Sequence, residues 1–359
     1  MSSLSVVHLS RGREWRGGER QVRLLVQTLA TRGVEQSLIT ARGSILAREV
    51  AGGGPPPRGV PWRTAWDPRA LAGTLRHIRR IRAARQPGLV LHAHDSHALA
   101  VALAAAGWFR LPVVATRRSV TTPGRLWRKP IRVIALSRAV ETALLAAGVP
   151  PERIVQVPSA VALETLAQVR PAAELPTNPR GPRLVVAVGA LTREKGHHLL
   201  IEAQALVQHA LPDALLAIIG DGPERRRLEA LARRHGLADR VRFLGARPDA
   251  TALMAAAGVL AQPSVREALG TTVLEAMALG IPVVSSGSGG LVELLAGGAG
   301  VLVPPDDPPA LAAALIRVLT DQELRRATIR TARARVREYD ALGVADRVVA
   351  VYRSALATH

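Results

Sequence analysis

The chain contains no cysteine, which excludes disulfide bonds, thiolate metal ligands and cysteine nucleophiles. Aromatic residues make up only 3% of its 359 residues, and this argues against a protein that stacks single-stranded bases on aromatic rings. No apolar run approaches the roughly 20 residues that a membrane-spanning helix needs, and the amino-terminal residues lack the pattern of a signal peptide. We therefore expect a cytoplasmic protein whose only contact with a membrane is peripheral.

Lysine is almost absent as well, because only Lys129 and Lys195 stand among the 48 basic residues. Against 28 acidic residues these give a formal net charge of +20. The excess is uneven: residues 1–175 carry a net +16 and residues 176–359 only +4. Such a field attracts anionic lipid head groups, phosphorylated glycans or nucleic acid, and the low aromatic content disfavours nucleic acid.

The length corresponds to two domains at roughly 150 residues each, and an apolar fraction of 48% is enough to form packed cores. Short β-branched runs alternate with helical stretches from end to end, which predicts an α/β protein with doubly wound parallel sheets. The predicted strands are 4–9, 36–40, 89–93, 112–116, 131–136 and 153–157 in the first half, and 184–188, 215–219, 241–244, 259–261, 282–285 and 300–303 in the second.

Four prolines interrupt the chain between residues 170 and 183, where neither a helix nor an inner strand can continue. We predict a linker there, between an amino-terminal domain over 1–169 and a carboxy-terminal domain over 184–340. The last segment, 341–359, is predicted to be a helix that packs on the first domain. Doubly wound sheets bind ligands beyond the carboxyl ends of their strands, so two such domains would hold a ligand in a cleft between them.

The loop at residues 189–196 follows a predicted strand and precedes a helix, and it reads Gly-Ala-Leu-Thr-Arg-Glu-Lys-Gly. Backbone amides at a helix N-terminus bind phosphate when a cation lies nearby. Arg193 and Lys195 are therefore candidates for holding a diphosphate, and the alternative is two solvated surface charges. Because lysine is so rare in this chain, its presence here favours the functional interpretation.

Two glutamates, Glu267 and Glu275, stand with seven residues between them after another predicted strand. If a helix starts near Thr272, both carboxylates can face one ligand. The structural alternative is a capping box, because Thr272 with Glu275 and Ser264 with Glu267 both have the required spacing.

Glycine pairs follow two further strands. Gly289 and Gly290 open a helix in the second half, and Gly18 follows the first strand. Glycine at such positions lets the backbone approach a phosphate or a sugar, but it is equally suited to a tight turn.

Three histidines and an aspartate stand within residues 92–97. We disfavour a metal site, because alternate strand residues share a face while the next ones lie on a turn. His94 or His97 is predicted to hydrogen-bond a hydroxylated ligand, and the alternative is a satisfied interior histidine. Arg117 and Arg118 follow the next predicted strand, and they would supply two cations to the same edge of the predicted cleft as His94 and His97. The sequence contains no Ser-His-Asp pattern, Walker loop or Asp-x-Asp metal motif.

Taken together, the segments 188–196, 219–223, 241–245 and 264–293 resemble the family-four retaining glycosyltransferases of the GT-B fold, in which two Rossmann-like domains face each other across a cleft. The first half is similar to bacterial members associated with envelope polysaccharide and lipopolysaccharide assembly. The resemblance implies transfer of a sugar from a nucleotide-diphosphate sugar to a hydroxyl of a glycan or glycolipid. We expect no metal or other cofactor, because Lys195 and Arg193 can supply the charge, and we expect no nucleic acid as a partner.

The resemblance also implies residue roles. Glu275 would bind the nucleotide ribose, and Glu267 would face the donor sugar, with the amides of Leu269 and Gly270 near its hydroxyls and phosphate. Ala190 stands where the family usually has arginine, so Arg193 is the candidate replacement. The predicted catalytic residues are Glu267, Lys195, Arg193 and His94; the predicted donor-binding residues are Gly18, Leu244, Leu269, Gly270, Glu275, Gly289 and Gly290; and the acceptor-side residues are His97, Arg117 and Arg118.

Two other functions are compatible with the same motifs. A GT-B nucleotide-sugar epimerase would need no acceptor. A non-catalytic protein of this fold that binds glycans or nucleic acid would account for Ala190 and for the positive charge.

Overall fold

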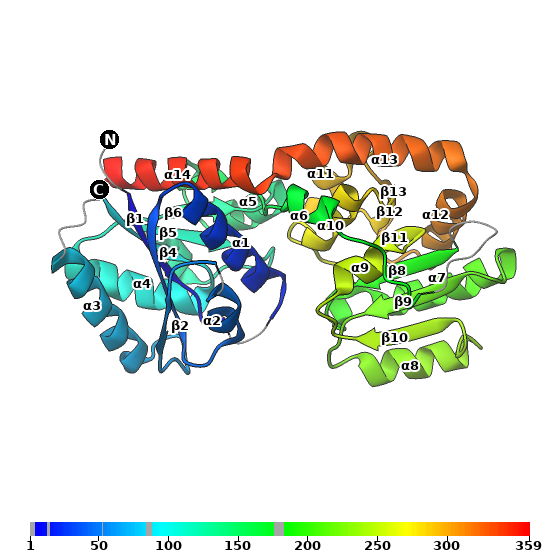
Figure 1. Cartoon of the computed structure of the whole chain (residues 1–359), viewed down its shortest axis with the longest axis horizontal. Coiled ribbons are helices and arrows are strands. Elements are labelled where there is room, and N and C mark those ends of the chain that lie inside the picture. Colours follow the sequence, from blue (N-terminus) through cyan, green and yellow to red (C-terminus); the bar gives the residue numbers. More distant parts are fainter. Residues whose placement is uncertain (1–3, 13–14, 52, 84–87, 176–182) are drawn as a thin grey trace. The chain divides into compact units, whose positions relative to one another are not determined.

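The computed structural model describes residues 4–12, 15–51, 53–83, 88–175 and 183–359. Two compact units divide the chain (Figure 1). The first comprises Met1–Ala160 together with Ala341–His359, and the second comprises Val161–Asp340. The boundary thus precedes the segment 170–183 that the sequence predicted as the linker, and residues 176–182 of that segment lie outside the described residues.

Among the described residues, the first unit contains a seven-stranded parallel sheet in the order β3-β2-β1-β4-β5-β6-β7. Every residue of β1, β4 and β5 is buried, as expected for strands that helices cover on both faces. The strands are β1 (Ser5–Leu9), β2 (Glu35–Ala41), β3 (Pro57–Val60), β4 (Leu89–Ala93), β5 (Val113–Arg117), β6 (Arg132–Ala135) and β7 (Ile154–Gln156).

Three helices of this unit, α2, α4 and α5, begin at side chains that accept a hydrogen bond from the first turn. Asp95 caps α4 through the amide of Ala98, and Ser137 caps α5 through the amide of Val140. The helices are α1 (Gly17–Thr31), α2 (Ile45–Val50), α3 (Pro68–Ala83), α4 (Ser96–Phe109), α5 (Arg138–Ala146) and α14 (Ala341–Ala357), with 3-10 turns η1 (Arg125–Arg128) and η2 (Pro151–Arg153).

The carboxy-terminal helix α14 completes the core of the first unit. Its residues Val344, Val348 and Tyr352 recur every four positions and pack in one cluster with Val6 and Val90 of the sheet. Figure 1 shows α14 in red beside the blue and cyan elements of this unit. With the helix included, the first unit carries 27 basic and 9 acidic residues, a net +18, and the second unit a net +2.

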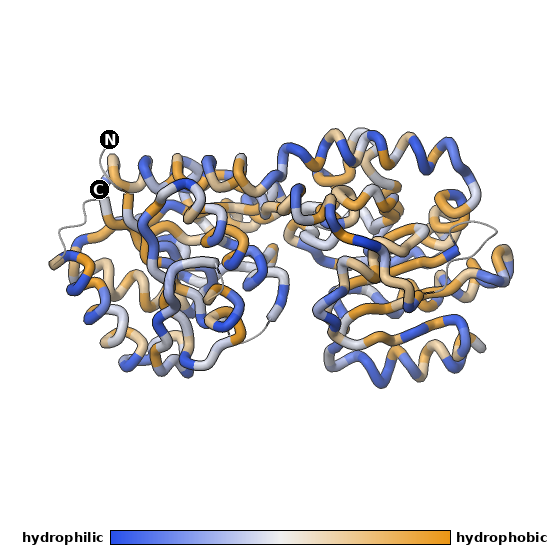
Figure 2. Tube along the Cα trace, viewed as in Figure 1, coloured by the Kyte–Doolittle hydropathy of each residue, from blue (hydrophilic) through white to orange (hydrophobic). Residues whose placement is uncertain are grey.

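The second unit contains, in its described part, a six-stranded parallel sheet in the order β10-β9-β8-β11-β12-β13. Figure 2 shows its strands largely orange, whereas the outer helix α8 is mostly blue. The strands are β8 (Leu184–Val188), β9 (Leu215–Ile219), β10 (Val241–Gly245), β11 (Val259–Gln262), β12 (Val283–Ser286) and β13 (Val301–Val303). The helices are α6 (Leu163–Ala167), α7 (His197–Ala210), α8 (Arg225–Arg234), α9 (Ala250–Ala255), α10 (Thr271–Leu279), α11 (Gly290–Leu294), α12 (Pro308–Thr320) and α13 (Gln322–Val336), with turns η3 (Arg193–Lys195), η4 (Ala296–Gly298) and η5 (Arg337–Tyr339).

The twelve predicted strands are all present with ends shifted by no more than two residues, and β3 is a thirteenth that the pattern did not predict. β3 begins at Pro57 and lies at the sheet edge, where a proline costs no ladder hydrogen bond. No helix in the described part of the chain is both long enough and apolar enough to cross a membrane.

Candidate functional site

Three loops meet at the carboxyl edge of the second sheet, because β8, β11 and β12 are neighbours there. The amide of Val265 donates to the carbonyl of Glu194 (2.9 Å), which ties the loop after β11 to the loop after β8. The hydroxyl of Ser288 donates to the carbonyl of Val265 (2.8 Å), which ties the loop after β12 to the same segment. The motifs that the sequence placed in separate loops therefore form one structural unit.

Lys195 and Glu267 are in direct contact in this unit. Lys195 Nζ lies 2.6 Å from Oε2 of Glu267, and the Glu267 side chain is only 12% exposed. The same carboxylate accepts from Ser264 Oγ at 3.3 Å and from the amide of Ala268 at 3.2 Å. Arg193 lies in η3 and is exposed. The loops thus present an enclosed ion pair with a second cation beside it.

Glu275 is the fifth residue of α10 and is half-buried. The helix begins at Thr271 with Gly270 as its N-cap, so Thr272 is the second helical residue and cannot cap it. In the described chain Ser264 is not at the start of a helix, because the next helix begins only at Thr271, and its hydroxyl contacts Glu267 within a loop. The structural alternative of two capping boxes is therefore wrong.

The glycines of these loops are required by close packing of backbone against backbone. A Cβ at Gly196 would overlap the carbonyl oxygen of Pro263, and one at Gly289 would overlap that of Glu267. Gly289 and Gly196 also have positive φ, 54° and 68°. Gly290 lies equally close to the carbonyl of Ala268. These contacts set the position of the backbone on either side of Glu267.

Two of the predicted donor-binding residues, Leu269 and Leu244, are apolar and at least half-buried. Leu269 is buried, with 2% exposure, so its side chain belongs to the packing and only its backbone is available to a ligand. Leu244 lies in β10, an edge strand, at the point where its register to β9 shifts. It is half-buried in the second unit.

His197, the first residue of α7, is a site neighbour that the sequence analysis missed. It is 3% exposed, and burial lowers the pKa of its imidazole to about 4, with Lys195 adding to the effect. A histidine beside the predicted phosphate loop was visible in the sequence, but its burial was not.

In the first unit, the predicted residues at the carboxyl edge separate into different environments. Gly18 lies in the first turn of α1, and a Cβ there would lie 3.6 Å from Cδ of Arg118. Burial lowers the pKa of Arg118 to about 10, and the charges of Glu19 and Asp95 partly oppose that shift. The Nε of Arg118 is buried and has no hydrogen-bond partner among the described residues. Gly18 and Arg118 are thus neighbours, and their predicted roles toward a ligand stay predictions.

Arg117 is directed into the fold instead. It is 8% exposed, donates to the carbonyl of Ser119 (3.1 Å) and to both oxygens of Thr121, and stacks 5.2 Å from the ring centre of Trp127. Its donors are used to hold the loop after β5. The expectation that Arg117 supplies a cation to the edge of the predicted cleft is therefore wrong, because its guanidinium is held against Trp127 and the loop after β5.

His94 belongs to a buried cluster of three imidazoles with His8 and His92. Its Nε2 lies 3.0 Å from Nδ1 of His8, whose Nε2 lies 3.1 Å from Gln36 Oε1. His92 contacts the hydroxyl of Tyr352 at 2.6 Å on α14. Burial lowers the pKa of all three imidazoles, that of His8 to about 4.

One nitrogen from each ring of this cluster lies within 4.8 Å of the others, a spacing that a metal ion could use. The other nitrogens of the cluster are engaged in the hydrogen bonds just described and in one between His92 Nε2 and Thr116 Oγ1 at 2.8 Å, whereas Nδ1 of His94 has no partner among the described residues. His94 is therefore an interior histidine, but not the satisfied one that the sequence analysis offered as the alternative, and its predicted hydrogen bond to a hydroxylated ligand stays a prediction. His97 has a 41% exposed side chain and lies on the first turn of α4.

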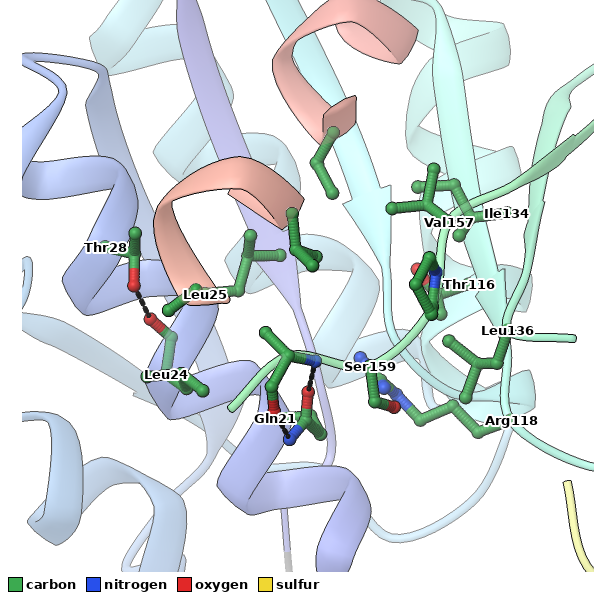
Figure 3. A pocket seen from close by; sticks show the side chains of 15 residues that line it. Gln21, Leu24, Leu25, Thr28, Thr116, Arg118, Ile134, Leu136, Val157 and Ser159 are labelled. Atoms are coloured by element: carbon green, nitrogen blue, oxygen red, sulfur yellow. Dashed lines mark hydrogen bonds between the residues drawn. The ribbon is translucent and has the colours of Figure 1, made fainter. Parts of the chain in front are cut away.

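A small pocket surrounds Arg118 in the first unit (Figure 3). Figure 3 shows the Arg118 side chain pointing toward Ser159, and Gln21 tying α1 to Ala160 through two hydrogen bonds. The cavity volume is about 30 Å³, enough for about two water molecules.

Comparison with known proteins agrees with these features. Residues 174–335 match the family described as glycosyl transferases group 1, and residues 15–165 match glycosyltransferase family 4. Phosphatidyl-myo-inositol mannosyltransferase of Mycobacterium leprae is 31% identical over 282 residues, which cover 74% of this chain and 73% of that protein. The D-inositol 3-phosphate glycosyltransferase of Corynebacterium urealyticum is 37% identical over 186 residues, 49% of this chain and 44% of that protein, so this match spans less than half of the relative.

Solved structures agree in fold. Anabaena HepE in complex with UDP-glucose superposes with a TM-score of 0.83 at 22% identity, covering 98% of this chain and all of that one. WaaG, a glycosyltransferase involved in lipopolysaccharide biosynthesis, gives a TM-score of 0.69 at 20% identity, covering 97% and 99%. With two parallel-sheet units of this topology and matches over both, the chain belongs to the family-four glycosyltransferases of the GT-B fold.

Proposed function

We propose that the protein is a retaining glycosyltransferase that moves a sugar from a nucleotide-diphosphate sugar to a hydroxyl of a cell-envelope glycan or glycolipid. The observation that carries this proposal is the contact between Lys195 and Glu267 at the carboxyl edge of the second sheet. It places a carboxylate and a cation within one ligand's reach, which is what a sugar joined to a diphosphate requires.

The chemistry follows from the charges that develop when the glycosidic phosphate bond breaks. Positive charge grows on the anomeric carbon, and in this proposal the carboxylate of Glu267 stabilises that charge. Negative charge grows on the departing diphosphate, which Lys195 and Arg193 neutralise. In a front-face reaction the departing phosphate itself takes the acceptor proton, so neither a separate base nor a metal or cofactor is needed.

The acceptor is proposed from charge and from relatives. A net +18 on the first unit favours a lipid-linked or phosphorylated acceptor and contact with the anionic inner leaflet from the cytoplasmic side. In support, relatives that cover part of this chain are named for phosphatidyl-myo-inositol and for lipopolysaccharide core synthesis, the latter at 37% identity over 148 residues. Equal sedimentation with neutral and anionic liposomes at moderate salt would argue against membrane contact.

A screen of nucleotide sugars tests the donor. UDP, GDP and ADP sugars are added to the full chain, and the unfolding temperature is measured; a ligand at 100 times its dissociation constant adds about 2.7 kcal/mol of stability. The sugar that stabilises most is then incubated with glycolipid acceptors, and the anomeric configuration of the product is read by NMR. An inverted product would refute retention, and conversion of the donor alone to another nucleotide sugar would indicate an epimerase.

A further inference from the structure

A second hollow lies at the opposite edge of the first sheet from Arg118 and His94. It is a groove of about 1070 Å³ that includes Val113 and Ile131, where β5 and β6 begin. Arg118 and His94 follow the carboxyl ends of β5 and β4 instead. The groove is therefore separate from the residues assigned to the transfer reaction.

The lining of the groove has a broad apolar part. Leu103 and Ala106 of α4 contribute one wall, and Leu126 of η1 contributes another. Trp66 also lines it and is 63% exposed. A large aromatic side chain that is this exposed beside apolar walls indicates a surface whose burial by a ligand would be energetically favourable.

Four cations line the same groove: Arg110, Lys129, Arg132 and Arg153. None of them forms an ion pair with a carboxylate in the part of the chain that the structure describes, although Glu152 also lines the groove. Arg132 donates to the carbonyl of Glu152 (2.5 Å) and Arg153 to that of Arg128 (3.5 Å), which hold these two side chains in place. Four cations thus share the groove with one acidic side chain, that of Glu152.

Arg110 has an unusual backbone. It closes α4 with φ 52°, in the left-handed region where glycine is the usual residue, and its amide donates to the carbonyl of Ala106.

We propose that this groove binds one molecule of a phosphorylated lipid, with the phosphate among the four cations and the first part of the chain along the apolar walls. Charge complementarity selects the head group, since arginine and lysine are the side chains that bind phosphate. A free anion would leave the apolar walls and Trp66 in water, and an uncharged lipid would offer the four cations no negative charge. The site lies outside the reaction machinery, so it holds whether or not the donor assignment is correct.

The test is direct binding of dodecyl phosphate to the full chain, below its micelle concentration and in about 0.15 M salt, where a Debye length of about 8 Å screens distant charges. We expect saturable binding of one molecule per chain. Arg110→Glu with Lys129→Glu should weaken it at least tenfold, because two exposed cations are then replaced by carboxylates that repel the phosphate. The matched control is Arg79→Glu with Arg80→Glu on α3, which changes the net charge equally outside the groove and should retain the affinity. Equal weakening by both pairs would overturn the proposal.

Two further arms identify the ligand and the place. Dodecyl maltoside carries the chain without charge and inorganic phosphate the charge without chain; either one binding as tightly as dodecyl phosphate would overturn the proposal. The change in tryptophan emission on binding should disappear in Trp66→Phe and persist in Trp108→Phe, which is also exposed but does not line the groove. A change that persists in Trp66→Phe would place the ligand elsewhere. Unfolding temperatures confirm that each variant is folded.

Discussion

Lys195 Nζ and Glu267 Oε2 lie 2.6 Å apart although 72 residues separate them in the chain. The contact joins the loop after β8 to the loop after β11, which are adjacent strands of the second sheet. Glu267 is fixed further by Ser264, Gln262 and the amide of Ala268. A carboxylate held by this many groups loses little conformational entropy when a ligand arrives, and the following predictions depend on that preorganisation.

Glu267→Gln should lower kcat by at least about 100-fold, because the amide keeps the shape and loses the charge that stabilises the transition state. The matched control is Glu194→Gln, an exposed neighbour of Lys195 that contacts the loop only through its backbone carbonyl. It should retain more than half of the activity. Steady-state rates with the donor found in the screen make the comparison, and equal losses in both variants would show that Glu267 is not the reacting carboxylate.

Gly289→Ala should destabilise the second unit by about 2 kcal/mol or more, because the new Cβ would overlap the carbonyl of Glu267 at a backbone conformation with φ 54°. Displacement of that carbonyl should also lower donor affinity. Gly287→Ala is the control in the same loop, since its Cβ would lie 3.5 Å from the nearest atom, the carbonyl oxygen of Val303. Urea unfolding and donor titration measure both effects, and a Gly289→Ala protein as stable as the control would contradict the structure.

Arg117→Lys should cost about 1–3 kcal/mol of stability and leave donor affinity unchanged. Lysine cannot reach Ser119 and Thr121 together or stack on Trp127 as a planar guanidinium does. Arg125→Lys, on the exposed surface of η1, should be neutral. Denaturant midpoints test this. A loss of activity without a loss of stability would return Arg117 to the acceptor-side residues.

The protein should lose stability as the pH falls from about 6.5 toward 4. Burial lowers the pKa of His8 and of His197 to about 4, whereas in the unfolded chain both titrate near 6.5. Between these values the unfolded chain binds protons that the folded chain does not, so stability is complete above pH 6.5 and declines below it. Each such histidine contributes roughly 1.4 kcal/mol per pH unit within this window.

Unfolding free energies at pH 7 and pH 5 measure the effect. His8→Gln should reduce the dependence on pH, and His235→Gln, at an exposed position after α8, should leave it unchanged. Asp67, whose pKa the amide of Arg63 lowers from 3.8, contributes only below this window. Identical pH dependence in all three proteins would mean that the buried histidines are not responsible.

Local pattern determined much of this protein. Alternating strands and helices gave the two doubly wound sheets, because hydrophobic periodicity and turn residues act within a few positions along the chain. The same pattern put Lys195 and Glu267 in loops after strands, and parallel strands end at one edge, so their proximity followed from topology. The edge strand β3 escaped prediction because Pro57 opens it.

Other features depended on packing between distant segments. Arg117 and Arg118 are chemically identical neighbours, yet Arg117 is enclosed by Trp127 and the loop after β5 while Arg118 lies beside Gly18. The environment of His94 depends on His8, 86 residues away. The packing of α14 on the first unit depends on contacts between segments far apart in the sequence. The same is true of the groove at the amino ends of β5 and β6. The sequence by itself excluded cysteine chemistry and disfavoured base stacking, because it has no cysteine and few aromatic residues. Only the tertiary structure decided which of the many arginines and histidines remain accessible to a ligand, because their burial depends on segments far away in the chain.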